Sequence, residues 1–191
     1  MEAIIMCGMP AVGKTTVAKT IASRLGLPLV GGGDILKEIA LEQGYSATGD
    51  DWWDTAEGME FLEKRKGSAK FDREVDARLL KKVEKGSVVI TSYTVPWLAK
   101  KGIKVWLSGT PDSRAVRMAK RDSSTTEETL KVISKRDAEN YLLYKKLYGI
   151  EFGRDLSPFQ LVVGTDGIDA EKVAKEIMDY ISAIGTRRLD R

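Results

Sequence analysis

The sequence predicts an α/β fold in which a parallel sheet of five strands is covered by helices on both faces. Three observations support this. Short apolar runs alternate along the 191-residue chain with longer segments whose apolar residues recur at helical spacing. A glycine-rich loop joins the first run to the first amphipathic segment. The composition, 42% hydrophobic and 31% charged, is typical of a globular chain that can bury one sizeable core.

The first strand is expected over residues 2–7, and a helix is expected over residues 15–25. The loop between them fits G-x-x-x-x-G-K-[ST], whose backbone N–H groups bind nucleotide phosphates. It reads Gly8-Met9-Pro10-Ala11-Val12-Gly13-Lys14-Thr15-Thr16. Its glycines let the backbone approach an anion without a Cβ in the way, and the helix N-terminus favours negative charge. We interpret the loop as a nucleotide site, with Lys14 on the β and γ phosphates and the Thr15 hydroxyl on Mg²⁺.

The next segments predict a second strand, a helix and an insert. Residues 27–30 are the second strand, and Asp34 caps a helix that ends near Gly44. Residues 45–70 are interpreted as a mobile insert over the site, with a short helix near residues 59–62. Its neighbouring tryptophans, Trp52 and Trp53, could stack on a base, but core packing is favoured.

The remaining segments continue the alternation of helices and strands. We expect Asp72 to cap a helix through residue 84, a capping box of Thr125 and Glu128 to begin a long helix to Tyr148, and Asp169 to cap the last helix. The other elements are strands at 87–90, 103–107 and 160–163, a helical turn through 96–98 and a helix that begins at Pro111. Residues 1–184 therefore form one domain, followed by a basic tail over 185–191.

Composition excludes several functions. The chain has no histidine, which removes histidine-based triads and zinc sites. Cys7 is the single cysteine and is expected to be buried filler. The net charge of +3 is too small to indicate nucleic-acid binding by itself, and the sequence shows no basic stripe interleaved with aromatic residues. Since no apolar run approaches the ~20 residues of a membrane span and the start lacks a basic leader, we expect a cytoplasmic protein without nucleic-acid or membrane partners, and a monomer.

The carboxyl ends of parallel strands share one rim, where ligands bind. The glycine loop, residues 31–34 and residues 91–93 therefore lie together. Arg114, Arg117 and Arg121 are on the helix after the fourth strand, and Arg136 is on the next one. This helical hairpin, with residues 117–136, is interpreted as a lid that closes on phosphates, against the alternative of a solvated basic surface.

The chain resembles the nucleoside monophosphate kinases, most of all the archaeal-type cytidylate kinases, over roughly residues 1–182. The resemblance is carried by the glycine loop, Asp34-Ile-Leu-Lys-Glu-Ile-Ala40, Phe71-Asp-Arg-Glu-Val-Asp76, Trp97, the lid arginines, Leu147-Tyr-Gly-Ile150 and Leu161-Val-Val163. It implies a sheet ordered 2-3-1-4-5, ATP–Mg²⁺ as donor and CMP or dCMP as acceptor. Lys14, Arg117, Arg121 and Arg136 would hold the transferring phosphoryl, and the backbone near Thr165 and Asp166 would contact adenine. The acceptor would be surrounded by Asp34, Lys37, Asp72, Arg73, Asp76 and Trp97.

The chain departs from the family pattern at the acceptor. Tyr93, Lys37 and Leu143 stand where arginines are expected, and Thr91 stands where the third strand would end in an acid. Arginine holds phosphate with a planar fork that these side chains lack. Three functions therefore remain open: a CMP kinase, a kinase for another nucleotide or small metabolite, and an ATP-binding switch without efficient transfer.

Overall fold

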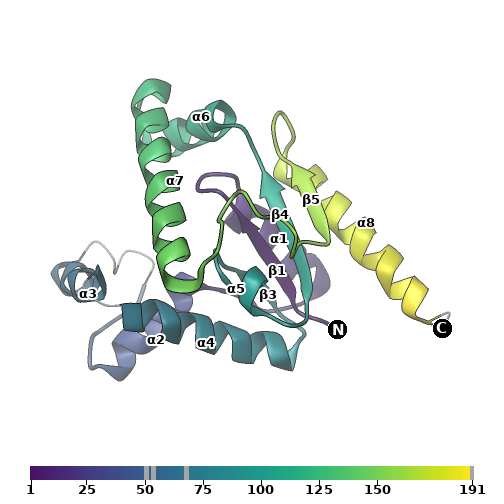
Figure 1. Cartoon of the computed structure of the whole chain (residues 1–191), viewed down its shortest axis with the longest axis horizontal. Coiled ribbons are helices and arrows are strands. Elements are labelled where there is room, and N and C mark those ends of the chain that lie inside the picture. The colour runs from purple at the N-terminus through teal and green to yellow at the C-terminus, as the bar shows by residue number, and fades with distance from the viewer. Residues whose placement is uncertain (50–51, 53–54, 67–68, 190–191) are drawn as a thin grey trace.

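The computed structural model describes residues 1–49, 52, 55–66 and 69–189. Five parallel strands form one sheet, and their order, β2-β3-β1-β4-β5, is the predicted one. The strands are β1 (Ile4–Gly8), β2 (Leu29–Gly31), β3 (Val89–Thr91), β4 (Ile103–Ser108) and β5 (Leu161–Gly164). Helices lie on both faces of this sheet, so the predicted three-layer α/β/α class is confirmed (Figure 1).

Most of the helices cover the two faces of the sheet, and α6 and α7 extend beyond it. Their bounds are α1 (Lys14–Leu25), α2 (Gly32–Glu42), α3 (Ala56–Lys66), α4 (Ala69–Lys85), α5 (Val95–Leu98), α6 (Pro111–Asp122), α7 (Thr126–Tyr148) and α8 (Ala170–Leu189). Helices α1 and α8 pack over one core, and α2, α4 and α5 pack over another. Helices α6 and α7 pair with each other beyond the sheet, and α7 stands upright beside it in Figure 1.

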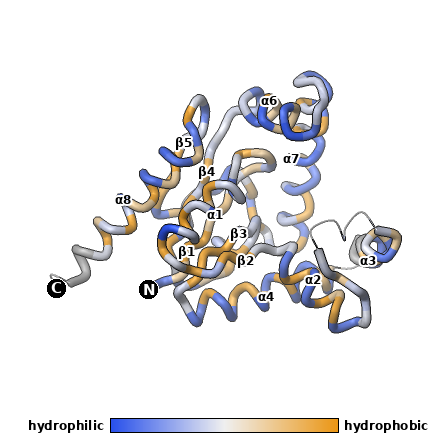
Figure 2. Tube along the Cα trace, turned by 180° about the vertical axis from the view of Figure 1, so that it is seen from behind, coloured by the Kyte–Doolittle hydropathy of each residue, from blue (hydrophilic) through white to orange (hydrophobic). Residues whose placement is uncertain are grey.

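Strand β1 lies at the centre of the sheet and carries the glycine loop at its carboxyl end. It pairs with β3 through Ile4 and Val89 and with β4 through Ile4 and Ile103. All five of its residues are buried, which explains why it appears in the sequence as a continuous apolar run. Figure 2 shows the hydrophobic colour concentrated in these central strands. Cys7 is fully buried there and burial raises the pKa of its thiol to about 12, so its predicted role as filler is confirmed.

Two expected helix starts were wrong by a few residues. Helix α2 begins at Gly32, so Asp34 is not the N-cap; its carboxylate accepts a hydrogen bond of 2.7 Å from the N–H of Gly31. Helix α4 begins at Ala69, so Asp72 lies in its first turn. An acidic residue stabilises a helix N-terminus both as a cap and within the first turn, so composition alone does not fix the first residue.

The other helix signals are confirmed, with one difference at the C-terminus. Thr125 and Glu128 form the expected capping box of α7, and Asp169 accepts a hydrogen bond of 2.8 Å from the N–H of Lys172 at the start of α8. Helix α8 continues to Leu189 and so includes most of the expected tail. The sequence after Ile181 contains Gly185 but no proline, and a single glycine does not end a helix. None of the helices within the described residues has the length and apolarity that crossing a membrane requires.

The aromatic side chains of the insert pack into the core beside α2 and α4. Trp52 is 3% exposed and its ring centroid lies 5.7 Å from Phe61 and 6.5 Å from Tyr45. Phe61 lies 5.5 Å from Phe71 of α4, which joins the insert to the core beside α2 and α4. The favoured interpretation of Trp52 as a core residue is confirmed, and α3 is the expected short helix. Trp53 lies outside the described residues.

Candidate active site

The glycine loop joins β1 to α1 through backbone conformations that other residues rarely adopt. Gly8 has a φ of +148° and Gly13, the N-cap of α1, has a φ of +95°. A Cβ on Gly8 would lie 2.4 Å from the carbonyl oxygen of Leu107, so the loop can leave the sheet here only as glycine. Ala11 is also left-handed, with a φ of +62°. Helix α1 therefore begins directly after the loop, with no side-chain cap on its first N–H groups among the described residues, and such N–H groups can bind an anion.

Lys14 is folded back along the loop. Its Nζ donates hydrogen bonds to the carbonyls of Gly8, at 2.7 Å, and Met9, at 3.0 Å. The same Nζ lies 4.5 Å from the centre of the Tyr93 ring. Burial lowers the pKa of Lys14 to about 8, and the charges of Arg136 and Arg114 act in the same direction. The Lys14 ammonium therefore lies in an enclosed site, where anionic oxygens bound nearby would stabilise its positive charge.

This pKa predicts that nucleotide binding weakens in alkaline solution. A lysine attracts phosphate only in its protonated form, and at pH 9 about nine tenths of a group with a pKa of about 8 is neutral. We expect the dissociation constant of Mg–ATP to be about tenfold larger at pH 9 than at pH 7. Calorimetric titrations across this range would measure it, with Lys14→Met as a control that should flatten the profile. If the affinity of the parent protein for Mg–ATP were the same at pH 7 and pH 9, Lys14 would not be the group that binds the phosphates.

A cavity of about 530 Å³ opens beside the loop, between α2, α4, α7 and the end of β3. Five of the predicted site residues line it, and these are Lys14, Thr15, Asp72, Asp76 and Arg136. Its apolar and aromatic wall includes Leu36, Val75, Leu79, Leu143, Tyr93 and Tyr144, and its other polar side chains include Thr91, Ser92, Thr94 and Asn140. The cavity thus combines two cations next to the phosphate loop with two carboxylates from α4.

Asp76 is the most enclosed acid of the cavity, with 6% of its surface exposed. Thr94 donates to its Oδ1 at 2.5 Å, and the hydroxyl of Tyr148 donates to its Oδ2 at 2.7 Å. Burial and the hydrogen bond to Asp76 raise the pKa of Tyr148, so that the phenol stays a donor. The sequence indicated Asp76, but it gave no sign of Thr94. Tyr148 was noticed only as part of a matching segment, because 72 positions separate it from its partner.

Four predicted acceptor residues do not line the cavity. Asp34 bonds the backbone of Gly31, and Lys37 donates a hydrogen bond to the carbonyl of Gly49 in the insert. Arg73 is exposed on α4. Trp97 packs edge-on against Trp106 and Phe159, at 6.3 and 5.1 Å between ring centroids. Three of these side chains therefore have other contacts in this structure, and Arg73 is exposed to solvent.

The arginines of α6 are also directed to different places. Arg117 donates to the Thr165 Oγ1 at 3.0 Å and to the Thr165 carbonyl, so it joins α6 to the end of β5. Arg121 is exposed and pairs with its neighbour Asp122. Of the arginines expected in the lid, only Arg136 lines the cavity. Arg114, on the same helix, is buried and contacts the glycine loop, a role that helical spacing could not reveal.

Sheet order, glycine loop and enclosed lysine define a nucleotide-binding protein of the P-loop class. Comparisons with known proteins agree. A family model described as an AAA domain matches residues 4–142. A cytidylate kinase of Pyrococcus horikoshii is 32% identical, covering 95% of this chain and 91% of its own. One of Ignicoccus hospitalis is 32% identical, covering 93% and 97%. A gluconokinase structure from Sinorhizobium meliloti shares the fold, with a TM-score of 0.58, 17% identity and coverage of 98% and 95%.

The chain belongs to the cytidylate kinase family of P-loop proteins. It is an ATP-dependent phosphotransferase, and ATP is its phosphoryl donor.

Proposed function

We propose that the protein is a nucleoside monophosphate kinase that transfers the γ-phosphoryl group of ATP to CMP or dCMP. The observation that carries the proposal is the composition of one cavity. Its lining includes the two cations Lys14 and Arg136 together with the buried carboxylate of Asp76. The similarity to cytidylate kinases over more than nine tenths of the chain supports it. The cations suit two phosphates that must approach each other, and the carboxylate suits a base that carries an amino group.

On the donor side, the free backbone N–H groups of the glycine loop and of the first turn of α1 would bind the phosphates of ATP. Lys14 would leave the loop carbonyls for the β and γ oxygens, and Arg136 would face the transferring group from α7. Arg117 and Thr165 would flank the adenine, and Arg121 would reach the phosphates only after α6 and α7 move inward. Catalysis then consists of alignment and charge stabilisation, because the acceptor phosphate attacks in line without a covalent intermediate.

Magnesium fits this site as a partner of the nucleotide. Within the described residues there is no group of three acidic, histidine or cysteine side chains that could hold a metal ion. Mg²⁺ does not need one, because it commonly takes substrate phosphates, waters and one or two protein oxygens. The Thr15 hydroxyl lines the cavity and would be the protein oxygen. A bound Mg²⁺ would supply neutralisation of the charge on the β and γ oxygens.

On the acceptor side, Asp72 and Asp76 would recognise the base. Cytosine presents its N4 amino group as a donor, and a carboxylate is a suitable acceptor for it. Uracil presents a carbonyl at the same position, which a carboxylate repels. Tyr148 and Thr94 hold both oxygens of Asp76, so the carboxylate is fixed before the substrate arrives.

The test is coupled ADP release with Mg–ATP and each of CMP, dCMP, UMP, AMP and GMP in turn. We expect strong stimulation by CMP or dCMP and weak stimulation by UMP. Nucleotide binding without stimulation by any monophosphate would overturn the proposal and favour another acceptor or a switch.

A second candidate is a kinase for an acceptor that carries no phosphate. The observation that favours it is the identity of the cavity wall: Tyr93 and Leu143 occupy positions where an arginine could have held a second phosphate. The shared fold of the gluconokinase is compatible with such an acceptor.

A single substitution tests whether a phosphate of the acceptor lies against α7. Leu143 lines the cavity seven residues, or two helical turns, after Arg136. If the acceptor is a nucleoside monophosphate, Leu143→Arg adds a charge-assisted hydrogen bond and should lower its KM by about tenfold or more. Leu142→Arg is the matched control, because Leu142 directly precedes Leu143, does not line the cavity and is 65% exposed. An unchanged or higher KM in the Leu143 variant, with the nucleotide still phosphorylated, would show that no acceptor phosphate lies near α7.

A further inference from the structure

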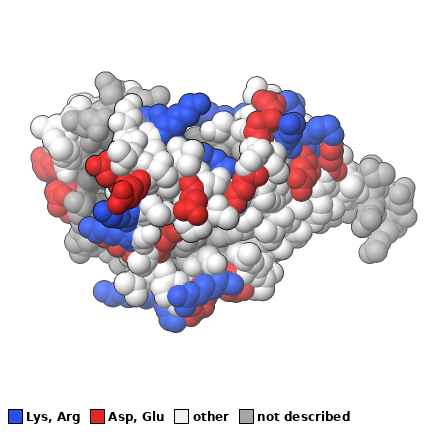
Figure 3. Space-filling view, turned by 90° about the horizontal axis from the view of Figure 1, so that it is seen from above, with Lys and Arg blue, Asp and Glu red and all other residues white. Residues whose placement is uncertain are grey.

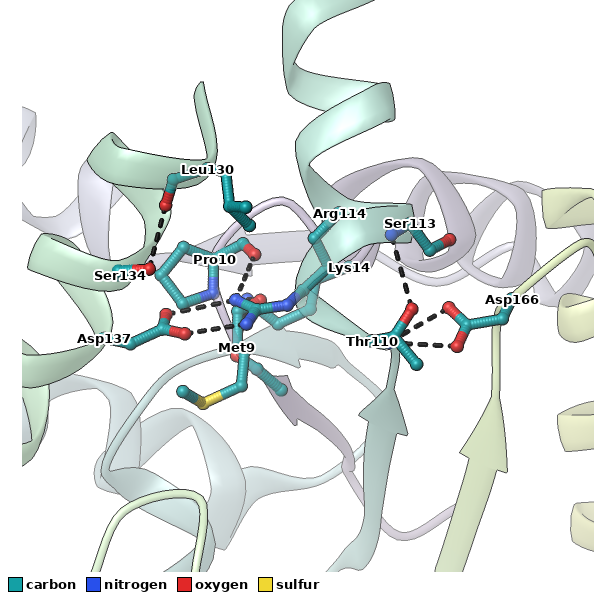
Figure 4. Close-up of polar contacts among 11 residues, drawn as sticks. Met9, Pro10, Lys14, Thr110, Ser113, Arg114, Leu130, Ser134, Asp137 and Asp166 are labelled. Atoms are coloured by element: carbon teal, nitrogen blue, oxygen red, sulfur yellow. Dashed lines mark hydrogen bonds and ion pairs between the residues drawn. The ribbon is translucent and has the colours of Figure 1, made fainter. Parts of the chain in front are cut away.

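Arg114 connects three segments that are far apart in the sequence. Its guanidinium lies on α6, 2% of the residue is exposed, and it forms two parallel hydrogen bonds with the carboxylate of Asp137 on α7, at 2.7 and 3.0 Å. A further hydrogen bond of 3.2 Å reaches the carbonyl of Pro10 in the glycine loop. Figure 4 shows the guanidinium between the Asp137 carboxylate and the loop, with Lys14 close by. A buried charge with these partners is held in one orientation.

The contact with Pro10 fixes the direction of a donor in the loop. The Pro10 carbonyl and the Ala11 N–H belong to one planar trans peptide, so they point in opposite directions. As long as Arg114 holds the carbonyl toward α6 and α7, the Ala11 N–H points away from these helices. Among the residues that the structure describes, no acceptor is bonded to this N–H. It is therefore available to an anion on the other side of the loop.

Packing restrains the same point of the loop. The Ala11 side chain contacts a small cluster formed by Ala115 and Met118 of α6 and Ile133 of α7. The φ of +62° at Ala11 is unfavourable for a residue with a Cβ, and such conformations persist only where their surroundings impose them. The Arg114 hydrogen bond and the apolar cluster are those surroundings.

Asp137 connects this arrangement to the cavity. It follows Arg136 on α7, and Arg136 lines the cavity. The charges of Arg114, Arg136 and Asp137 all influence the pKa of Lys14, which places the pair within electrostatic range of the catalytic centre. The ion pair therefore anchors both the glycine loop and the segment of α7 that carries the second cation.

We propose that Arg114 and Asp137 are positioning residues that hold the glycine loop in its phosphate-binding form and set it against Arg136. Neither residue needs to touch the nucleotide. The proposal rests on the donor side of the proposed function alone, so it holds for any acceptor.

The test separates positioning from stability. A buried ion pair can often be replaced by apolar side chains of similar volume without loss of stability, whereas removal of one partner leaves an unpaired charge. The double variant Arg114→Met with Asp137→Leu should therefore stay folded while the Pro10 carbonyl loses its donor. We expect its affinity for Mg–ADP, measured by calorimetry, to fall about tenfold or more, and kcat to fall with it. The melting temperature without nucleotide should change little.

Two further variants make the result decisive. Arg114→Lys retains a donor for Pro10 and should recover part of the affinity, and Asp137→Asn decides the question on a nearly isosteric background if the double variant does not fold. Lys135→Gln with Glu139→Gln removes an exposed ion pair of α7 and is the control that should leave binding unchanged. Mg–ADP affinity within twofold of the parent in the folded double variant, or in Asp137→Asn if the double variant does not fold, would overturn the proposal. Because ADP binding needs no acceptor, this result does not depend on whether CMP is the substrate.

Discussion

Lys14→Met is expected to lower kcat for phosphoryl transfer by about 10²–10³-fold, the usual effect of removing one preorganised donor from a transition state. Methionine keeps the length of the stem but has neither charge nor N–H groups. In the structure Lys14 donates hydrogen bonds to carbonyls of its own loop and lies over the ring of Tyr93. It lines the same cavity as Arg136. The phosphoryl group in transfer would therefore be left with Arg136 as the remaining cation on the described cavity wall.

The comparison needs a lysine that lies on the same helix but outside the site. Lys19 of α1 is exposed, and Lys19→Met should leave kcat and KM unchanged. Stopped-assay measurement of ADP with saturating ATP and acceptor gives kcat directly. A Lys14 variant that keeps more than a tenth of the parent kcat would show that the charge at this position is not used in the transition state.

Gly8→Ala is expected to lower the free energy of unfolding by about 3–5 kcal/mol, since backbone strain and overpacking each typically cost about 1–3 kcal/mol. The new Cβ would lie 2.4 Å from the Leu107 carbonyl oxygen and 3.0 Å from Val12. Leu107 belongs to β4, so relief of the clash would separate β4 from β1, its partner in the sheet. The φ of +148° at this position adds strain for any residue with a Cβ.

Urea unfolding followed by circular dichroism measures this loss. Gly185→Ala is the matched control, because a Cβ there meets no atom within 4 Å and the residue lies in helix α8. Alanine stabilises a helix relative to glycine, so the control should be neutral or slightly more stable. Equal stability of the Gly8 variant and the parent would mean that the loop leaves β1 along a different path.

Local signals were sufficient for most of the fold. The glycine loop, the capping box at Thr125 and the cap at Asp169 depend on residues within a few positions of one another, and each was predicted correctly. The starts of α2 and α4 were not, because an acidic residue near a helix N-terminus has several equivalent positions. The strand order came from the resemblance to a family, since hydrogen bonding between strands leaves no local pattern.

The site was predicted less completely, for a related reason. The residues that follow from the loop pattern, Lys14 and Thr15, line the cavity together with Asp72, Asp76 and Arg136. The contacts that organise them connect distant segments, such as Tyr148 with Asp76 and Arg114 with Asp137. Spacing on α6 made Arg114 equivalent to Arg117 and Arg121, although only Arg114 is buried. Whether an arginine faces solvent, a neighbouring helix or a ligand is decided by tertiary packing.

Charge on the surface is mixed rather than segregated on the face drawn in Figure 3, where basic and acidic side chains lie next to each other. Such a face offers no continuous positive track to a polyanion. The electrostatic features that matter for phosphate chemistry are instead enclosed, in the loop and the adjoining cavity.

The two largest hydrophobic cores lie on opposite faces of the sheet, so different parts of the cavity and loop are supported by different sets of side chains. The core under α1 and α8 supports the glycine loop through Val12 and Val17. The core under α2 and α4 supports the cavity wall, which we propose admits the acceptor, and extends into the insert through Trp52 and Phe61. The sheet stands between them. A mutation that repacks the second core can therefore alter which acceptor is admitted while the machinery for ATP remains intact. Descendants of one ancestral kinase could in this way diverge in substrate without passing through a form unable to bind its donor.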